Sequence, residues 1–268
     1  MWYNRRMKMK FIKTHGLGND FVLMDGRRET PWDMPALSKR LCERRTGIGA
    51  DGLVFIRPSK TADIRMQIFN SDGSEAQMCG NAIRCFARYA YERGIVAQKS
   101  MRIETLAGIR EAECMQDGNV RICMGAPAFL SEGLCSVQLG EETIAYWPLV
   151  MGVPHAVVPV DDPCARKWMR IGAQMEWAEP FPEGTNVDFI RVDDSENITM
   201  RVFERGCGET LCCGTGTTSA ALCAMRAGQV KECVRVHLTL GALTIEKRGA
   251  LSYMTGPAAF VYEGEVEI

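Results

Sequence analysis

Two stretches of the chain alternate apolar and polar residues with a period of two, which is the pattern of a half-buried β-strand. They are DIRMQIFN (63–70) and NITMRVFE (197–204), and polar turn residues bound both. Each leads through a turn into a Cys-Gly pair and then into apolar residues at helical spacing, in MCGNAIRCFARYAYERG (78–94) and CCGTGTTSAALCAMRAG (212–228). We therefore predict a strand, a turn and a helix twice, with the last glycine of each stretch ending its helix in the left-handed conformation.

Shorter segments extend this pattern in both halves. A helix is expected near residues 33–45, with a counterpart near 161–173. Two short strands should follow each Cys-Gly helix, in MRIETL (101–106), REAECM (110–115), VRVHLTL (234–240) and ALTIEK (242–247). The segment from about 125 to 145 contains Gly, Pro and Ser and is expected to be a linker. Successive strands with few helices favour a mostly antiparallel sheet around a central helix.

The two halves coincide when the chain is shifted by 134 positions, which is the separation of Cys79 and Cys213 (213 − 79). Nine positions between residues 66 and 96 then match identically without a gap, whereas random pairing would give roughly two. We therefore predict an α+β fold of two pseudo-symmetric repeats, each a mostly antiparallel sheet wrapped around a central helix. The repeats are expected over residues 9–130 and 140–268, with the active site in the cleft between them.

Composition narrows the classes of protein to which the chain can belong. The 268 residues carry a net charge of -1, and 46% of them are hydrophobic. Charges are spread along the chain, so neither a nucleic-acid partner nor a membrane surface is expected. No apolar run reaches the length of a membrane span, and the basic N-terminus lacks the apolar core of a signal peptide. We expect a cytoplasmic protein whose residues 1–8 precede the fold as an extension.

Twelve cysteines would indicate a disulfide framework in a small secreted protein. In a long chain without an export signal, reduced thiols are the better interpretation. No metal site is expected, because the chain has no C-x-x-C pair and its three histidines are far apart. Several cysteines should be small buried hydrophobic residues; these are Cys42, Cys85, Cys114, Cys123 and Cys223.

The two Cys-Gly pairs carry the candidate chemistry. A cysteine at a helix N-terminus feels unpaired N–H groups and about half a positive charge, so its pKa is expected to fall from about 8.5 toward neutrality. The residues that follow, Gly80-Asn81 and Gly214-Thr215, offer N–H groups to a substrate carboxylate. Inversion of a stereocentre requires an acid and a base on opposite faces of the α-carbon. Two facing Cys-Gly pairs would supply both, as in a two-base racemase.

At these residues the sequence resembles the diaminopimelate epimerase family, whose members interconvert LL- and meso-diaminopimelate without a cofactor. The reaction of this family supplies lysine and peptidoglycan biosynthesis. The resemblance runs from about Lys10 to Ile268. Its motifs are HGLGNDF (15–21), GIGADGL (47–53), FNSDGSEAQMCGNAIRC (69–85), GTNVDF (184–189), RVFERGCGETLCCGTG (201–216) and YMTG (253–256). The resemblance implies that Cys79 donates and Cys213 accepts the proton in the LL-to-meso direction, while the adjacent Cys212 is a packing residue.

The resemblance also assigns the remaining site residues. It implies that Arg205 pairs with the distal carboxylate of the substrate and Glu204 with the distal ammonium group. It further implies that His155 acts with Glu204 to tune the thiol pair. Three asparagines match substrate ligands of the family; these are Asn19, Asn70 and Asn186. Tyr262 matches a homodimer contact of the family, although an aromatic residue in a C-terminal strand could also be core.

The chain departs from the family pattern at Val153, where many members have Asn in a GNPH motif. Gly52 stands where some members carry Gln and others Gly. A racemase of another amino acid, such as histidine, therefore remains an alternative, against which the Glu204-Arg205 pair argues. A non-catalytic thiol or redox protein is the alternative of another class, and it gives no reason for Asn70, Glu204 and Arg205. A pyridoxal-phosphate racemase is disfavoured, because no lysine lies in the motifs around the paired cysteines.

Overall fold

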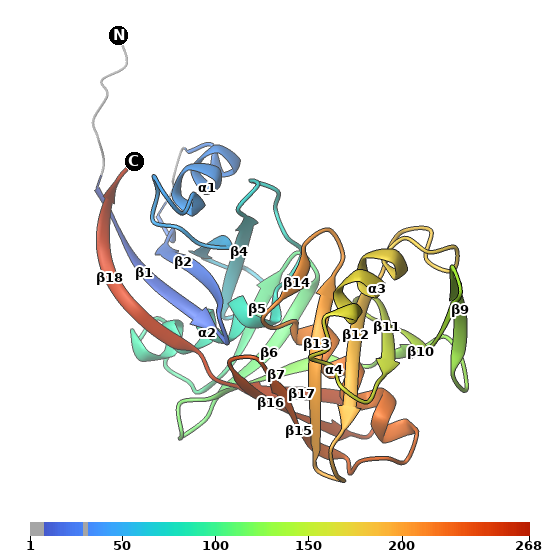
Figure 1. Ribbon diagram of the computed structural model, residues 1–268. Coiled ribbons are helices and arrows are strands. Elements are labelled where there is room, and N and C mark those ends of the chain that lie inside the picture. The colour runs from blue at the N-terminus through green and yellow to red at the C-terminus, as the bar shows by residue number, and fades with distance from the viewer. Residues whose placement is uncertain (1–7, 29–31) are drawn as a thin grey trace. The chain divides into compact units, whose positions relative to one another are not determined.

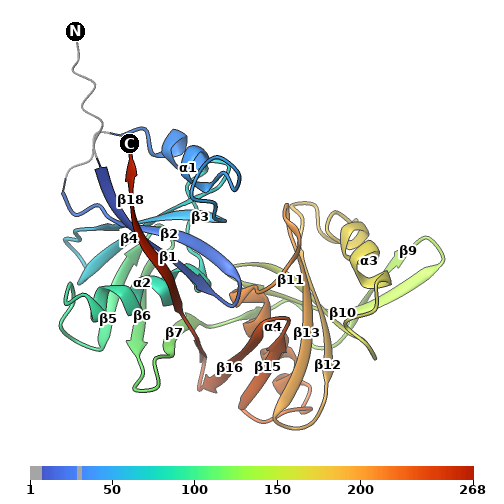
Figure 2. The same cartoon turned by 60° about the vertical axis from the view of Figure 1, so that its left-hand side comes forward.

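Two α+β units make up the chain in the computed structural model, which describes residues 8–28 and 32–268 (Figures 1 and 2). Unit 1 runs to Ile122 and also takes up Pro257–Ile268, and unit 2 is Cys123–Gly256. Residues 1–7 of the expected N-terminal extension lie outside the described residues, and Lys8 is already the first residue of a strand.

Unit 1 is a curved sheet with the strand order β18-β1-β2-β3-β4-β5-β6-β7. The pairs β2–β3 and β4–β5 are parallel, and the others are antiparallel. Its elements are β1 (Lys8–Gly16), β2 (Asn19–Asp25), α1 (Met34–Cys42), β3 (Gly52–Arg57), β4 (Ile64–Asn70), α2 (Gly80–Glu92), β5 (Ser100–Thr105), β6 (Gly108–Cys114), β7 (Val120–Gly125) and β18 (Ala259–Glu267).

Unit 2 repeats this arrangement with the strand order β10-β11-β12-β13-β15-β16-β17. Again two pairs, β11–β12 and β13–β15, are parallel. Its elements are β8 (Ala128–Phe129), β9 (Cys135–Leu139), β10 (Glu142–Met151), β11 (Val153–Pro159), α3 (Lys167–Met175), β12 (Asn186–Val192), β13 (Asn197–Glu204), β14 (Gly208–Thr210), α4 (Gly214–Arg226), β15 (Cys233–Leu238), β16 (Gly241–Arg248) and β17 (Leu251–Gly256).

The two units are related by the same shift of 134 positions that relates their sequences. Helices α2 and α4 begin and end 134 residues apart, and so do strands β2 and β11. The strand register follows the shift as well, since Phe21 faces Gly52 in unit 1 and His155 faces Asn186 in unit 2. The predicted α+β fold of two pseudo-symmetric repeats is confirmed.

Each unit is built around its Cys-Gly helix. Helix α2 buries one apolar stripe, which contains Ala82, Ile83, Phe86, Ala87 and Ala90. Helix α4 is buried on nearly all sides, including Thr217 and Thr218, whose hydroxyl groups donate to the carbonyls of Cys213 and Gly214. Both helices end at the predicted glycines, with φ 65° at Gly94 and 69° at Gly228. A residue with a Cβ would be strained in this left-handed conformation, so glycine ends each helix without strain.

The segment 125–145 is not the linker that its composition predicted. It contains β8, β9 and the start of β10, and β9 pairs with Glu142–Tyr146 as an antiparallel hairpin. Val137 and Ile144 are buried, and Gly140 at φ 61° forms the turn between the strands. Alternation of buried and exposed side chains therefore decides the structure here, and the Gly and Ser content does not.

Two further boundaries differ from expectation. Helix α3 starts at Lys167, six residues after the expected 161, because the Asp162-Pro163 turn precedes it and Asp162 accepts from the backbone N–H of Cys164 and, through its carbonyl, from Trp168. The last strand, β18, belongs to unit 1 because it pairs with β1 along nearly its whole length, as the neighbouring red and blue arrows in Figure 1 show. The compact units are therefore not the continuous ranges 9–130 and 140–268.

Helices long and apolar enough to cross a membrane do not occur in the part of the chain that the structure describes. All twelve cysteines lie in the described residues, and none of them forms a disulfide. Of those expected to be buried, Cys42, Cys85, Cys114 and Cys223 are buried and Cys123 is half-buried.

Candidate active site

Cys79 and Cys213 occupy the N-cap positions of α2 and α4, as the sequence predicted. Both have extended backbone, with φ -139° at Cys79 and -114° at Cys213, and the helix begins at the glycine that follows. Each thiol thus lies at the N-terminus of a helix, where the backbone N–H groups of the first turn favour an anion. The residues expected to supply them, Gly80-Asn81 and Gly214-Thr215, form the first turns.

The Cys213 sulfur lies inside unit 2, with 6% of the residue exposed. It accepts from the N–H of Gly216 at 3.4 Å and lies 3.3 Å from the Thr215 hydroxyl. Burial, and then the charges of Glu204 and Asp188, raise the pKa of the Cys213 thiol well above its usual range. The expectation that the helix N-terminus lowers this pKa toward neutrality is therefore wrong for Cys213. Half a helix charge does not outweigh loss of water and two nearby carboxylates.

Glu204 ends β13 and accepts a hydrogen bond from the hydroxyl of Thr210. Burial raises the pKa of Glu204, while hydrogen bonds from Thr210 and from Cys213 act in the opposite direction. Burial thus holds both the Cys213 thiol and the neighbouring carboxyl group of Glu204 toward their protonated forms. A pair of this kind can exchange a proton, because burial disfavours the charged form of both groups.

His155 contacts a partner that sequence reasoning missed. Its Nδ1 lies 2.8 Å from Oδ2 of Asp188, and neither side chain is exposed. Asp188 also packs against the first turn of α4, where a Cβ at Gly216 would overlap its Oδ1. His155 Nε2 and Asp188 Oδ1 are buried and have no hydrogen-bond partner among residues 8–28 and 32–268. The available signal was an aspartate within the apolar stretch VDFI (187–190) of strand β12.

Asn186 and Arg205 lie together at the adjoining strand ends of unit 2. The Asn186 carboxamide donates to the carbonyl of Pro154 and accepts from the backbone N–H of Arg205, both at 3.0 Å. The guanidinium of Arg205 donates to the carbonyl of Glu183 at 2.8 Å, and it forms no ion pair with a described side chain. Its charge is therefore not neutralised within the described residues, as a binding role for an external carboxylate would require.

In unit 1, Asn19 stands beside Cys79. Its Oδ1 accepts from the Cys79 thiol at 3.6 Å and from Nδ2 of Asn81 at 3.1 Å. Its Nδ2 donates to Oδ2 of Asp51 at 2.8 Å. Asn70, at the end of β4, is exposed and donates to the Ser74 hydroxyl at 3.0 Å. Of the predicted residues in unit 1, the structure thus brings Asn19, Cys79 and Asn81 into direct contact.

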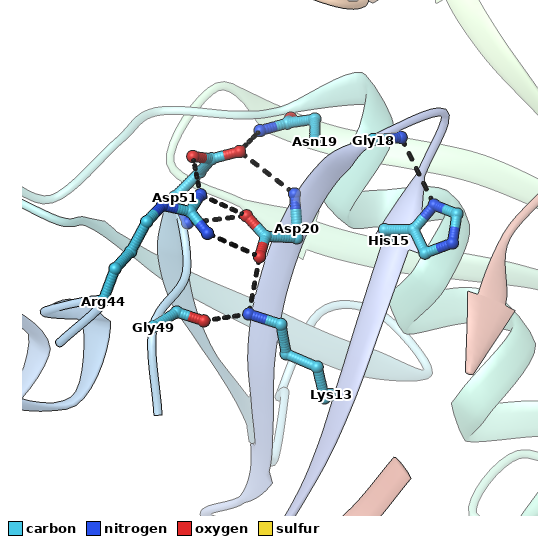
Figure 3. A network of polar contacts seen from close by, with 8 residues as sticks. All are labelled: Lys13, His15, Gly18, Asn19, Asp20, Arg44, Gly49 and Asp51. Carbon is cyan, nitrogen blue, oxygen red and sulfur yellow. Dashed lines mark hydrogen bonds and ion pairs between the residues drawn. The ribbon is translucent and has the colours of Figure 1, made fainter. Parts of the chain in front are cut away.

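A network of charged side chains adjoins Asn19 through Asp51, as Figure 3 shows. Lys13 is 2.6 Å from Asp20, and the Arg44 guanidinium bridges Asp20 and Asp51 at 2.8 Å each. Burial raises the pKa of Asp20, but hydrogen bonds from Arg44 and Lys13 outweigh it and lower this pKa to about 2. The motif GIGADGL supplies Asp51, a residue that the sequence analysis did not single out.

The structure also locates Val153, where the chain departs from the family pattern, Gly52, where the family varies, and Tyr262, which matches a dimer contact of the family. Val153 starts β11, next to the Pro154 carbonyl that Asn186 binds. At Gly52 an added Cβ would lie 2.9 Å from the carbonyl oxygen of Phe69, so the backbone excludes a larger residue here unless it shifts. Tyr262 on β18 is 47% exposed and packs edge-on against Phe11, and this exposure is not that of a core residue.

Sequence comparison relates the chain to one family. The family model described as diaminopimelate epimerase matches residues 11–130 and 149–261. The diaminopimelate epimerase of Moorella thermoacetica is 44% identical over 275 residues, which cover 96% of this chain and 99% of that protein. That of Pelotomaculum thermopropionicum is 46% identical over 275 residues, covering 96% and 98%.

Comparison of structures gives the same architecture at lower identity. A phenazine biosynthesis protein of the PhzF family from Bacillus anthracis superposes with a TM-score of 0.76 at 20% identity, covering 98% of this chain and 100% of that one. A hydroxyproline epimerase from Agrobacterium vitis gives a TM-score of 0.76 at 18% identity, covering 100% and 94%. At these identities the similarity establishes the fold alone.

Proposed function

Because this chain belongs to the diaminopimelate epimerase family, we propose that it interconverts LL- and meso-2,6-diaminopimelate, a reaction of lysine and peptidoglycan biosynthesis in the cytoplasm. Family relatives that are more than 40% identical over nearly the whole chain support this substrate. The observation that carries the reaction type is the pair of N-cap cysteines, which occupy equivalent positions of two pseudo-symmetric units. No cofactor takes part in the proposed reaction.

The proposed mechanism uses one cysteine on each face of the substrate α-carbon. In the LL-to-meso direction the Cys213 thiolate removes the α-proton and becomes a thiol, while the Cys79 thiol delivers its proton to the other face and becomes a thiolate. The negative charge that develops on the α-carboxylate is stabilised by the N–H groups of the two helix first turns. Burial makes the Cys213 thiolate a stronger base than an exposed one, since its pKa is raised.

The remaining side chains bind the substrate or tune the thiols. Arg205, without an ion-pair partner in the described chain, receives the distal carboxylate, and Glu204 receives the distal ammonium group. Glu204 and His155 also adjust the protonation of the cysteines, and Asp188 holds His155 in place. Hydrogen bonds to the substrate come from three carboxamides; these are Asn19, Asn70 and Asn186.

Deuterium incorporation tests the two-base mechanism. In deuterated water, product formed early should carry deuterium at its inverted α-carbon, while recovered substrate carries little. A single base that shuttles one proton would instead return the original hydrogen to the product, and that result would contradict the mechanism. Mass spectrometry and proton NMR of the first few per cent of turnover distinguish the two outcomes.

Val153 motivates a second candidate, a racemase of the same fold acting on another amino acid such as histidine. A panel of amino acids assayed with the purified protein separates the two candidates. Turnover of diaminopimelate well above that of every other amino acid supports the first. Substitution of Val153 by Asn should preserve or tighten diaminopimelate binding, and a marked loss would favour the second.

We also propose that the protein is a homodimer and that Tyr262 lies in the contact between its two subunits. The exposed position of this ring and of the neighbouring Val261 on β18 supports an interface. Light scattering should give twice the mass of the 29.8 kDa chain. Tyr262→Ala should shift the protein toward monomer at micromolar concentration, whereas a monomeric wild-type protein would contradict this part of the proposal.

A further inference from the structure

The orientation of the Asn19 carboxamide is determined by its partners. The Asp51 carboxylate can only accept, so it must face the Asn19 amide nitrogen, which it does at 2.8 Å. The Asn81 amide nitrogen can only donate, so it must face the Asn19 oxygen, which it does at 3.1 Å. Both constraints select the same orientation, and they place the Asn19 oxygen 3.6 Å from the Cys79 sulfur.

Asp51 is itself held firmly, although its side chain is 44% exposed. Its Oδ1 accepts from Arg44 at 2.8 Å, and its Oδ2 also accepts from the backbone N–H of Asp20 at 3.1 Å. In return, the backbone N–H of Asp51 donates to Asp20, whose carboxylate is paired with buried Lys13. Figure 3 shows Asp51 between the Arg44 guanidinium and the Asn19 amide.

The end of the carboxamide that faces a thiol determines which protonation state it favours. A carbonyl oxygen accepts the S–H hydrogen and stabilises the thiol, whereas an N–H group donates to sulfur and stabilises the thiolate. The two ends of an asparagine side chain have nearly the same shape, so only hydrogen-bond partners prevent a half-turn of the amide. Without the Asp51 acceptor, the preference for the oxygen-toward-sulfur orientation would weaken.

We propose that Asp51 is a positioning residue, which orients the Asn19 carboxamide so that its oxygen faces Cys79 and keeps this cysteine in the proton-bearing form. The catalytic meaning of this inference rests on the proposed function, in which Cys79 is the proton donor. The orientation itself does not depend on that function and can be tested in the free protein.

Other charged and titratable groups surround these residues and must be held constant in the test. Strands β1 and β2 contribute Lys13, His15 and Asp20, Arg44 follows α1, and α2 contributes Arg84 and Cys85. Removal of the Asp51 charge alone would also favour the Cys79 thiolate by simple electrostatics. A useful experiment must therefore separate the charge of Asp51 from its role as an acceptor.

Two substitutions of Asp51 make this separation. Asp51→Asn loses the charge but retains an oxygen that can accept from Asn19, whereas Asp51→Ala loses both. The measured quantity is the pH midpoint of Cys79 alkylation by iodoacetamide, followed by mass spectrometry of the peptide that contains Cys79. We expect the midpoint of Asp51→Ala to lie about half a pH unit or more below that of Asp51→Asn. In an Asn19→Ala background the two substitutions should give the same midpoint.

Equal midpoints for Asp51→Ala and Asp51→Asn in the protein with Asn19 would overturn the inference, and so would a difference that persists in the Asn19→Ala background. Asn19→Ala leaves the network of Lys13, Asp20 and Arg44 intact, and by itself it should lower the Cys79 midpoint. An unchanged midpoint in that variant would also overturn the inference. Absence of epimerase activity in the wild-type protein would contradict the proposed function and leave the alkylation result valid.

Discussion

Asp188 binds the imidazole of His155 from the neighbouring strand, at 2.8 Å between Oδ2 and Nδ1, with both side chains fully buried. The carboxylate accepts the Nδ1 hydrogen and leaves Nε2 as the ring nitrogen without a partner in the described chain. The parallel pairing of β11 and β12, in which His155 faces Asn186, brings the two side chains together. The charge of Asp188 also contributes to the raised pKa of the Cys213 thiol.

Asp188→Asn should lower kcat at least tenfold, because a neutral amide no longer fixes the tautomer of His155. Loss of the negative charge also favours the thiolate, so the limb of the pH–rate profile that reports Cys213 should move to lower pH. The profile is measured as kcat/KM between pH 6 and pH 10. Asp193→Asn removes a carboxylate just after the same strand and should leave the profile unchanged. An Asp188→Asn profile that matches wild type would contradict the assigned role.

Glu204→Gln should make the protein more stable at neutral pH while it abolishes activity. The pKa of Glu204 is raised in the folded state, so its contribution to stability is present below its unfolded pKa and is lost as the pH rises through the folded pKa. A neutral Gln has no such loss. The melting temperature of the variant should therefore exceed that of wild type at pH 7.5, and the difference should shrink at pH 4. A lower melting temperature at pH 7.5 would show that Glu204 is stabilised as an anion.

The sequence predicted those features that local patterns or the repeat determine. Helices α2 and α4, their N-cap cysteines and their terminal glycines follow from periodicity and from the shift of 134 positions. The partners Asp51 and Asp188 lie 32 and 33 residues from the side chains they bind, and only strand pairing brings them there. The pKa of Cys213 depends on burial and on the carboxylates brought near by folding, neither of which the helix position reveals. The hairpin of β9 and β10 was not predicted, because the Gly, Pro and Ser content of residues 125–145 favoured a linker and the alternating pattern of its strands is short.

Arg205→Met should reduce diaminopimelate turnover by orders of magnitude, because it removes the charge proposed to bind the distal carboxylate. The effect should appear mainly in kcat/KM, since both thiols remain. Arg201→Met provides the matched control, because Arg201 lies on β13, which ends just before Arg205, and its guanidinium likewise donates to a backbone carbonyl. Near-wild-type turnover in Arg205→Met would show that the distal group binds elsewhere.

Asp20→Asn should lower the free energy of unfolding by about 2 kcal/mol at pH 7. The folded pKa of Asp20 is about 2, below its usual 3.8. This contribution is therefore present above pH 4 and is lost as the pH falls through about 2. Chemical denaturation at several pH values should show wild type and variant converging between pH 4 and pH 2. A constant difference over this range would mean that the ion pairs with Lys13 and Arg44 do not stabilise the fold.

The adjacent cysteines of unit 2 provide the most direct separation of chemistry from packing. Cys212 and Cys213 are both buried, at 2% and 6% exposure, but only Cys213 caps α4 and receives the N–H of Gly216. Cys213→Ala and Cys79→Ala should each abolish epimerisation, because each removes the only acid or base on one face of the substrate. Cys212→Ala should retain activity and lose about 1 kcal/mol of stability from the small cavity it leaves. Circular dichroism and thermal melts are used to check that all three variants fold. Substantial epimerase activity in Cys79→Ala or Cys213→Ala would eliminate the two-base mechanism, and loss of activity in folded Cys212→Ala would assign to that thiol a role that the family pattern does not give it.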